Sequence, residues 1–300
     1  MEGTFFATVS LQNSSSPISS IVSQFRKEET MTNVWMYSVA ASKDPDNILC
    51  SVPWRVDGDL TFFGPCKKRM RERLRSQFLG IDNSHATVID QLFIVGVNGG
   101  NSQRVRKVVW WGRISEVMTF CDADRRLRGN RFRKLRDDRD SPLHVRPLLE
   151  EGKLIGYEHV SNEHIEGGAW ISDLVSNSAR QNVRVDRRRL ILQHGNPWEA
   201  FDRDCCMLIE NRFFAQGEGI DLDEEALEIL REAQHDKTGI DSYAVFGLTV
   251  NGHANGLRGA FLDITDELAD RFIAWLEERS AKPPVNERAG YDGTTKTRCP

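Results

Sequence analysis

The chain has 300 residues, which is enough for one large domain or two ordinary ones. Its 39% hydrophobic and 28% charged residues are typical of a globular protein and exclude wholesale disorder, and its net charge is only −4. No apolar run approaches the roughly 18 residues of a transmembrane helix and no secretory signal is recognisable, so we expect a cytoplasmic protein without a membrane partner.

The six cysteines show neither a CxxC pair nor zinc-finger spacing. We therefore expect free thiols in a reducing compartment and no structural zinc.

The chain opens with a segment rich in Ser, Thr and Gln over residues 1–31, which predicts a disordered leader. Patterned sequence begins just after Met31, which makes this residue a candidate for the true start. Apolar and aromatic residues predict a first strand over residues 34–40 and another over Leu60 to Phe63.

A basic helix is predicted next, from about Cys66 to Phe78, because Pro65 favours a helix start and Gly80 a stop. Lys67 and Arg71 lie one helical turn apart, near a helix start whose free N–H groups favour an anion. We expect them to clamp a phosphodiester, and Lys67 is also a candidate catalytic residue. An exposed basic helix without a ligand is the alternative.

Apolar, β-branched segments over 91–97 and 105–117 flank the turn sequence Asn-Gly-Gly-Asn and predict an antiparallel hairpin in a curved sheet. The second strand carries Trp110 and Trp111. Aromatic rings beside arginines are what stacking on a flipped or unpaired base requires, so either tryptophan is a candidate stacking residue. Burial in the sheet core is the alternative.

Segment 122–140 is too polar for a core and predicts either a basic helix or a loop lying over the sheet. It belongs to the second of two basic windows, whereas the region around 218–228 is acidic. This asymmetry predicts a phosphate-binding face, and a pair of solvated helix faces is the alternative. The candidate DNA contacts in this window are Arg104, Arg106, Arg131 and Arg133.

Acid–base groups gather around a Gly-Gly bend between His159 and Asp173. Asp173 ends a predicted short strand and is a candidate general base or stabiliser of positive charge, with His159 or His164 assisting. An Asx cap at Asp173 and ordinary hydrogen-bonding histidines are the alternatives. The spacing of the two histidines has no established metal geometry, so we predict no metal site.

The remaining sequence predicts a linker over 181–188, amphipathic helices over 221–233 and 265–279, and a strand over 243–250. The predicted fold class is α+β, with a curved, mostly antiparallel sheet and flanking helices, as one large domain or two closely packed lobes. We expect a leader over 1–31, a basic, sheet-containing nucleic-acid-binding lobe over 32–180, an acidic α/β lobe over 181–280 ending in an amphipathic helix, and a disordered tail over 281–300.

Four motifs, taken in order, resemble the nucleotide-modification-associated domain families of phages and bacteria. They are Trp35-Met36-Tyr37-Ser38-Val39, Cys66-Lys67-Lys68-Arg69-Met70-Arg71, Trp170-Ile171-Ser172-Asp173, and a Gly256 to Gly259 segment that leads into Phe272 to Leu276. The chain departs from the family pattern at Lys68, where members often carry proline. The resemblance implies association with modified bases in DNA, in phage–host conflict or phage genome modification.

No Walker A motif, GxGxxG fingerprint or zinc-deaminase signature is present, so we predict no cofactor. The leading hypothesis is an enzyme that acts on modified bases in DNA, an N-glycosylase that extrudes the base and hydrolyses its glycosidic bond. A non-catalytic reader that binds a modified base and recruits a partner is the alternative. A base-modifying transferase would need a donor site that the sequence does not reveal.

Overall fold

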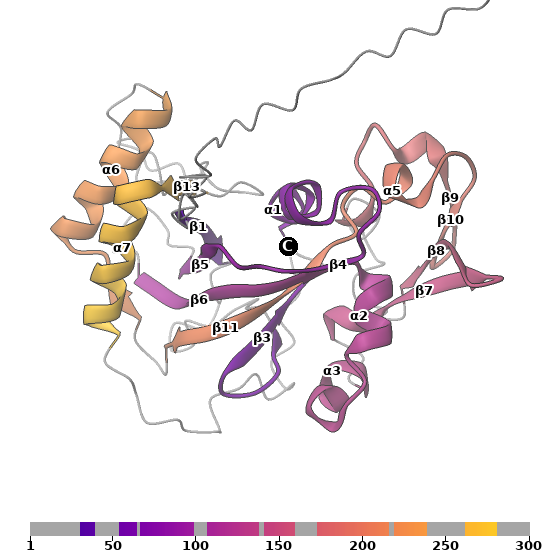
Figure 1. Ribbon diagram of the computed structural model, residues 1–300, viewed down its shortest axis with the longest axis horizontal. Helices are drawn as coiled ribbons and strands as arrows, with labels where there is room; N and C mark the ends of the chain where they lie inside the picture. Colours follow the sequence, from indigo (N-terminus) through magenta and orange to yellow (C-terminus); the bar gives the residue numbers. More distant parts are fainter. Residues whose placement is uncertain are drawn as a thin grey trace, which may run out of the picture. The chain divides into compact units, whose positions relative to one another are not determined.

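A nine-stranded sheet organises the fold, and its main path runs β13-β1-β5-β6-β11-β3-β2, with β4 and β12 pairing on β6 (Figure 1). The structure is a computed structural model and describes residues 31–39, 54–64, 67–98, 107–137, 141–159, 173–215, 219–238 and 262–280. The described strands of this sheet are β1 (Thr32–Val39), β2 (Trp54–Arg55), β3 (Leu60–Phe63), β4 (His85–Thr87), β5 (Gln91–Asn98), β6 (Lys107–Met118), β11 (Cys206–Phe214), β12 (Ile220–Asp221) and β13 (Leu262–Thr265).

The described pairings of this sheet are antiparallel except for that between β1 and β5. β5 and β6 form the predicted hairpin. The predicted α+β class with a large, mostly antiparallel sheet and several helices is therefore confirmed.

A second, four-stranded sheet has the order β7-β8-β10-β9 and is antiparallel throughout. Its strands are β7 (Val145–Glu150), β8 (Lys153–His159), β9 (Val183–Asp186) and β10 (Arg189–Leu192). The predicted linker over 181–188 is therefore wrong, because this segment contains β9 and the turn into β10. Only Val183 of β9 is buried, as suits an edge strand, and the polar residues around it concealed the strand in the sequence.

The two longest described helices, α6 (Glu224–Thr238) and α7 (Asp266–Arg279), confirm the predicted C-terminal helices. The predicted basic helix is α1 (Lys68–Leu74), which continues as the π-helical turn η1 (Arg75–Leu79). The shorter described helices are α2 (Phe120–Arg126), η2 (Asn130–Phe132), α3 (Arg133–Asp137), η3 (Pro142–His144), η4 (Arg180–Asn182) and α5 (Pro197–Ala200). None of the described helices is long and apolar enough to span a bilayer.

Three hydrophobic cores hold these elements together. One lies between the large sheet and α6 with α7, and includes Trp111 and Phe272. Another includes Trp110 and lies on the opposite face of the sheet, beneath α1 and η1. The third includes Tyr157 and Leu208, and so joins the second sheet to the large one.

The predicted boundary between residues 180 and 181 does not separate two sheets. β11 lies between β6 and β3, and β13 pairs with β1, so both sides of this boundary contribute strands to the large sheet. The predicted leader, the tail and the predicted strand over 243–250 lie outside the described residues.

Candidate nucleic-acid interface and its buried arginine network

Two arginines of the basic helix point into the protein. Arg71 is fully buried, and its Nη1 donates to the main-chain carbonyls of Arg203 and Cys205, the latter at 3.0 Å. Its Nη2 donates to the carbonyl of Asp173 at 2.5 Å. The prediction that Arg71 clamps a phosphodiester is therefore wrong, because backbone carbonyls occupy the guanidinium and solvent does not reach it.

Arg75 lies one turn further along and is 5% exposed. Its Nη1 donates to the carbonyl of Asp204 at 2.5 Å and lies 3.7 Å from that residue's Oδ2. Its guanidinium also lies 4.3 Å from the ring centroid of Trp198, a cation–π distance. The helical spacing does place Arg71 and Arg75 on one face, but that face binds the segment before β11.

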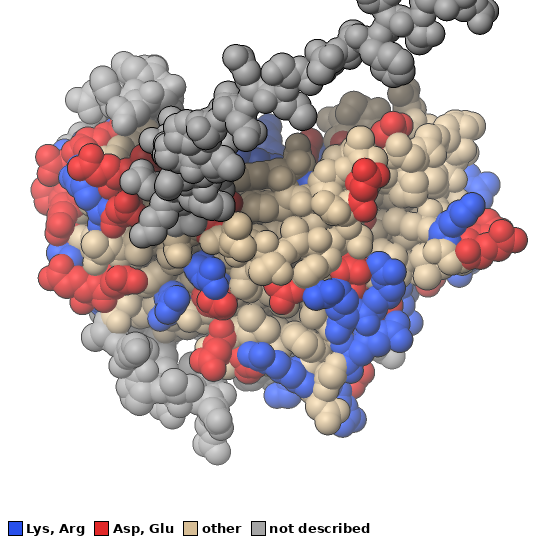
Figure 2. All heavy atoms as spheres, in the orientation of Figure 1, with Lys and Arg blue, Asp and Glu red and all other residues tan. Residues whose placement is uncertain are grey.

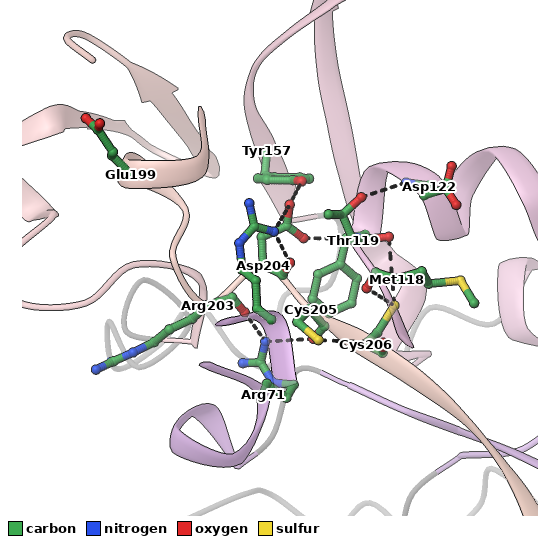
Figure 3. A network of polar contacts seen from close by, with 12 residues as sticks. Arg71, Met118, Thr119, Asp122, Tyr157, Glu199, Arg203, Asp204, Cys205 and Cys206 are labelled. Atoms are coloured by element: carbon green, nitrogen blue, oxygen red, sulfur yellow. Dashed lines mark hydrogen bonds and ion pairs between the residues drawn. The ribbon is translucent and has the colours of Figure 1, made fainter. Parts of the chain in front are cut away.

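Asp204 is the centre of this network (Figure 3). Its Oδ1 accepts a 2.7 Å hydrogen bond from the N–H of Phe120, and its Oδ2 accepts one from the hydroxyl of Tyr157. Burial raises the pKa of the Asp204 carboxyl, and Arg75 and these hydrogen bonds oppose that rise. The same contacts join β8, the start of α2 and the start of β11, so the network fastens the second sheet to the large one.

The adjacent cysteines Cys205 and Cys206 are buried beside this network. Burial raises the pKa of the Cys205 thiol to about 12 and raises that of Cys206 as well. The Sγ of Cys206 donates to the carbonyl of Met118 at 3.3 Å. Both thiols stay protonated at neutral pH and are unsuited to nucleophilic catalysis.

The two candidate stacking tryptophans are buried, Trp110 at 0% and Trp111 at 1% exposure. Nε1 of Trp110 donates to the Tyr37 hydroxyl at 2.9 Å, and Nε1 of Trp111 donates to Oγ of Ser280 at 2.8 Å. A Cβ atom on Gly96 would lie 2.1 Å from Nε1 of Trp110, its partner on β6, so the indole occupies space that any side chain at position 96 would fill. The prediction that either tryptophan stacks on a base is wrong, because the sheet cores enclose both rings.

Lys67 precedes α1 in the left-handed region, with φ 58° and ψ 51°. Its carbonyl accepts hydrogen bonds from the N–H groups of Met70 and Arg71, and its Nζ lies 5.0 Å from the ring centroid of Tyr37. A lysine in this conformation costs roughly 1–2 kcal/mol, and such strain is found at functional sites. A role for Lys67 in DNA contact or catalysis stays a prediction.

A basic surface runs along α2, η2 and α3, and is called the α2–α3 surface below. Residues 120–137 contain seven basic and three acidic side chains. The basic ones are Arg125, Arg126, Arg128, Arg131, Arg133, Lys134 and Arg136. Figure 2 shows blue side chains gathered over α2 and α3. The described part of the segment predicted as either a helix or a loop, residues 122–137, therefore forms short helices that present arginines to solvent.

Several of these arginines pair with nearby carboxylates. Arg125 contacts Asp122 at 2.8 Å, Arg128 contacts Asp124 at 3.4 Å, and both pairs lie within α2 or just beyond it. Arg131 pairs with Asp57. The side chains of Arg125, Arg128 and Arg131 are 50% or more exposed. The Asp122 side chain is buried, but the pairs of Arg128 and Arg131 are exposed. Exposed pairs contribute about 0–1 kcal/mol, so a phosphate can replace the carboxylate of these two pairs at low cost.

The predicted catalytic residues are described only in part. Asp173 is half-buried, and Arg71 holds its carbonyl. His159 is 5% exposed at the end of β8, and its main-chain N–H donates to the main-chain carbonyl of Arg188 at 2.9 Å. His164 and the candidate DNA contacts Arg104 and Arg106 lie outside the described residues. Catalysis by Asp173, His159 and His164 stays a prediction.

The sequence reasoning missed Arg75, Tyr157 and Asp204. A signal existed for Arg75, because it follows Leu74 and lies one turn after Arg71, which follows Met70. Met70 and Leu74 form the apolar stripe of the helix, so the next position on each turn borders the core. No comparable signal marks Tyr157 and Asp204, which are 47 residues apart in the chain.

In the part of the chain that the structure describes, no group of three or more His, Cys, Asp or Glu side chains is arranged to hold a metal ion. Comparisons with protein-family models, with curated proteins and with solved structures gave no match to this chain.

Proposed function

We propose that this protein binds DNA through the α2–α3 surface and acts on a base of the bound strand. The observation that carries the proposal is the excess of exposed arginine on α2 and α3, since arginine–phosphate contacts supply most of the affinity of DNA-binding surfaces. Arg131 and Arg133 belong to this surface, with side chains 50% and 79% exposed.

The proposed reaction is hydrolysis of the N-glycosidic bond. Water adds to C1′ of the deoxyribose, the bond from C1′ to the base nitrogen breaks, and the electron pair and a proton leave with the base. That proton comes from the attacking water and passes through Asp173, which also stabilises the positive charge on the sugar, while the water's second proton stays on the new C1′ hydroxyl. This assignment is supported by the hydrogen bond from the buried Arg71, which fixes the backbone of Asp173 beside the core.

A non-catalytic reader of modified bases is the second candidate. The observation that favours it is the burial of Trp110 and Trp111, because neither ring can serve as the aromatic floor that holds an extruded base. A reader needs the α2–α3 surface but tolerates the loss of the Asp173 carboxylate.

The test is incubation of the full chain with phage DNA that carries unmodified, hydroxymethylated or glucosylated cytosine. Released bases are measured by mass spectrometry and abasic sites by alkaline cleavage. For a glycosylase we expect release from one modified DNA, abolished by Asp173→Asn with DNA affinity kept. The exposed Asp82 in the loop after η1 provides the matched control, and Asp82→Asn should release bases normally. Binding without release would favour the reader.

The DNA contact itself is tested by the double variant Arg128→Gln/Arg133→Gln. We expect the slope of log K against log salt concentration to fall in magnitude by about 1.8, since each phosphate contact contributes about 0.9. Arg271→Gln is the control, because Arg271 is an exposed arginine on α7 that pairs with Glu232 at 2.8 Å. An unchanged slope in the double variant would overturn the assignment of the α2–α3 surface.

A further inference from the structure

A second basic element is formed by the turn between β9 and β10. Residues 184–189 hold four arginines and one acidic residue, Asp186. All six residues are exposed. β9 is the edge strand of the second sheet, so from Arg184 onward neither of its faces is covered. We call this segment the arginine turn.

The backbone of the arginine turn is strained at Arg187, where φ is 51°. A two-residue hairpin turn needs positive φ, which glycine or asparagine adopts at least cost. An arginine at this position gives up stability, and strain of this kind is a pointer to function. Arg187 and Arg188 are the two turn residues of the hairpin, since Asp186 pairs with Arg189, and both are exposed.

The neighbouring hairpin of the same sheet offers a comparison. Its turn, between β7 and β8, also has a charged residue with positive φ, Glu151 at 49°, followed by Gly152 at 79°. That turn carries Glu150 and Glu151 with Lys153, so its net charge is opposite to that of the arginine turn. Both turn residues have positive φ in the β7–β8 turn and only Arg187 does in the arginine turn, so the two turns differ in backbone geometry as well as in the charge they present to solvent.

The arginine turn lies at the end of the second sheet that adjoins the α2–α3 surface. The carbonyl of Arg188 accepts a 2.9 Å hydrogen bond from His159, and His159 lies opposite Val145 in the β7–β8 register. Val145 directly follows η3, which packs against both α2 and α3. Two strand spacings of roughly 5 Å each therefore separate the turn from Val145. The turn at Glu151 lies at the opposite end of β8 (Figure 1).

We propose that the arginine turn is a second phosphate-binding element, which contacts the same DNA duplex as the α2–α3 surface. This inference rests on the proposed DNA binding and extends the contact to a different sheet. Charge on an edge strand also prevents pairing with other chains. Charge of either sign prevents such edge-to-edge pairing, and Glu150 at the end of edge strand β7 is an acidic example. Protection of the β9 edge therefore does not explain why four arginines lie together.

The test uses the full chain and a DNA duplex of the kind that the unaltered protein binds. In Arg187→Gly/Arg188→Ser the turn loses two charges, and glycine suits the positive φ at position 187. We expect weaker binding and a salt slope smaller in magnitude by about 1.8, for two lost phosphate contacts at about 0.9 each. Thermal unfolding of the variant confirms that it is folded.

Two controls separate charge at this turn from other effects. Lys153→Ser removes an exposed cation from the other end of the same sheet and should leave the slope unchanged. Arg187→Lys/Arg188→Lys keeps the charge and should retain a slope close to that of the unaltered protein. If Arg187→Gly/Arg188→Ser leaves the slope of log K against log salt concentration unchanged while Arg128→Gln/Arg133→Gln reduces it, this inference alone is overturned. Failure of the unaltered chain to bind DNA would overturn the proposed DNA binding as well.

Discussion

The α2–α3 surface and the α6–α7 layer are both built from charged helices, yet their arginines are used differently. On α2 and α3, arginines pair mainly with carboxylates three or four residues away, as in Arg125 with Asp122 and Arg133 with Asp137. In the α6–α7 layer, Arg279 of α7 pairs with Asp223 at 2.9 Å and with Glu225 at 3.0 Å, and so joins two helices.

The difference lies in what each ion pair holds in place. A pair within one short helix can open without moving any other element, whereas a pair between helices is part of their packing. Carboxylates outnumber arginines on α6 and α7, so this layer has no excess positive charge to offer a phosphate, and Figure 2 shows mostly red side chains there. Position and sign of the charge excess, more than the number of arginines, distinguish the candidate DNA surface.

In the buried network, Arg71 and Arg75 are engaged in the packing of the protein. Within this network, Asp204→Ala should cause the largest loss in the free energy of unfolding. The variant leaves the Tyr157 hydroxyl and the Phe120 N–H without their acceptor and removes the carboxylate beside Arg75. We expect a loss of about 3–5 kcal/mol in the free energy of unfolding, measured by urea denaturation. A loss below about 1 kcal/mol would mean that this network does not fasten the two sheets.

The pH dependence of stability gives a second measure of the same group. Burial raises the pKa of Asp204, so the folded protein holds this proton more tightly than the unfolded chain does. The contribution is fully present below the ordinary pKa of aspartic acid and is lost as pH rises through the raised value. Unfolding free energies of the unaltered protein and of Asp204→Asn, compared across this window, should converge or cross as pH rises. Parallel curves would contradict a raised pKa.

In the α6–α7 layer the sharpest test is Trp275→Phe. Nε1 of Trp275 donates to Oδ1 of Asp223 at 3.0 Å, and its ring stacks on Phe272 at a centroid distance of 5.5 Å. The phenylalanine keeps the stacking and loses the hydrogen bond and part of the buried area. We expect a loss of about 1–2 kcal/mol in unfolding free energy and no change in DNA affinity. A change in DNA affinity would break the contrast between the two regions.

The sequence predicted the fold better than the site, for a physical reason. The α6 and α7 helices and the β5–β6 hairpin have clear apolar periodicity, because each buries one face. The residues of β9 lacked that pattern, since an edge strand buries little. Local patterns also cannot pair Tyr157 with Asp204, because only the packing of one sheet on the other brings them together.

For the candidate site, charge along the chain located a basic surface but misjudged which arginines reach solvent. Arg71 and Arg131 both lie in basic windows of the sequence. Met70 and Leu74 form the apolar stripe of α1, and the neighbouring Arg71 is therefore directed into the protein. Trp110 and Trp111 alternate along β6 and therefore face opposite cores, so neither remains on the surface. A tryptophan in a central strand is thus a weak indicator of base stacking.

On the α2–α3 surface, Arg128→Gln/Arg133→Gln should change the free energy of unfolding by less than about 0.5 kcal/mol while it reduces the salt dependence of DNA binding. Both side chains are well exposed, and their pairs lie within one helix or its end. Urea denaturation and fluorescence anisotropy on the same samples measure the two quantities. A large loss in the free energy of unfolding would show that Arg128 and Arg133 stabilise the fold, as Arg279 does, and that a phosphate cannot replace their carboxylate partners at low cost.

The smallest expected effect is a change in the pKa of Asp57. The hydrogen bond from Arg131 lowers the pKa of this carboxyl below its ordinary value, and the main-chain N–H groups of Asp59 and Leu60 add to the shift while partial burial opposes it. If phosphate competes for Arg131, saturating DNA should raise the pKa of Asp57 toward the ordinary value, as Arg131→Gln should without DNA. Carboxyl carbon NMR titration with and without a short duplex measures both shifts. A pKa that rises in Arg131→Gln but not on DNA binding would show that this ion pair stays closed, and that Arg131 belongs with the arginines that hold structure.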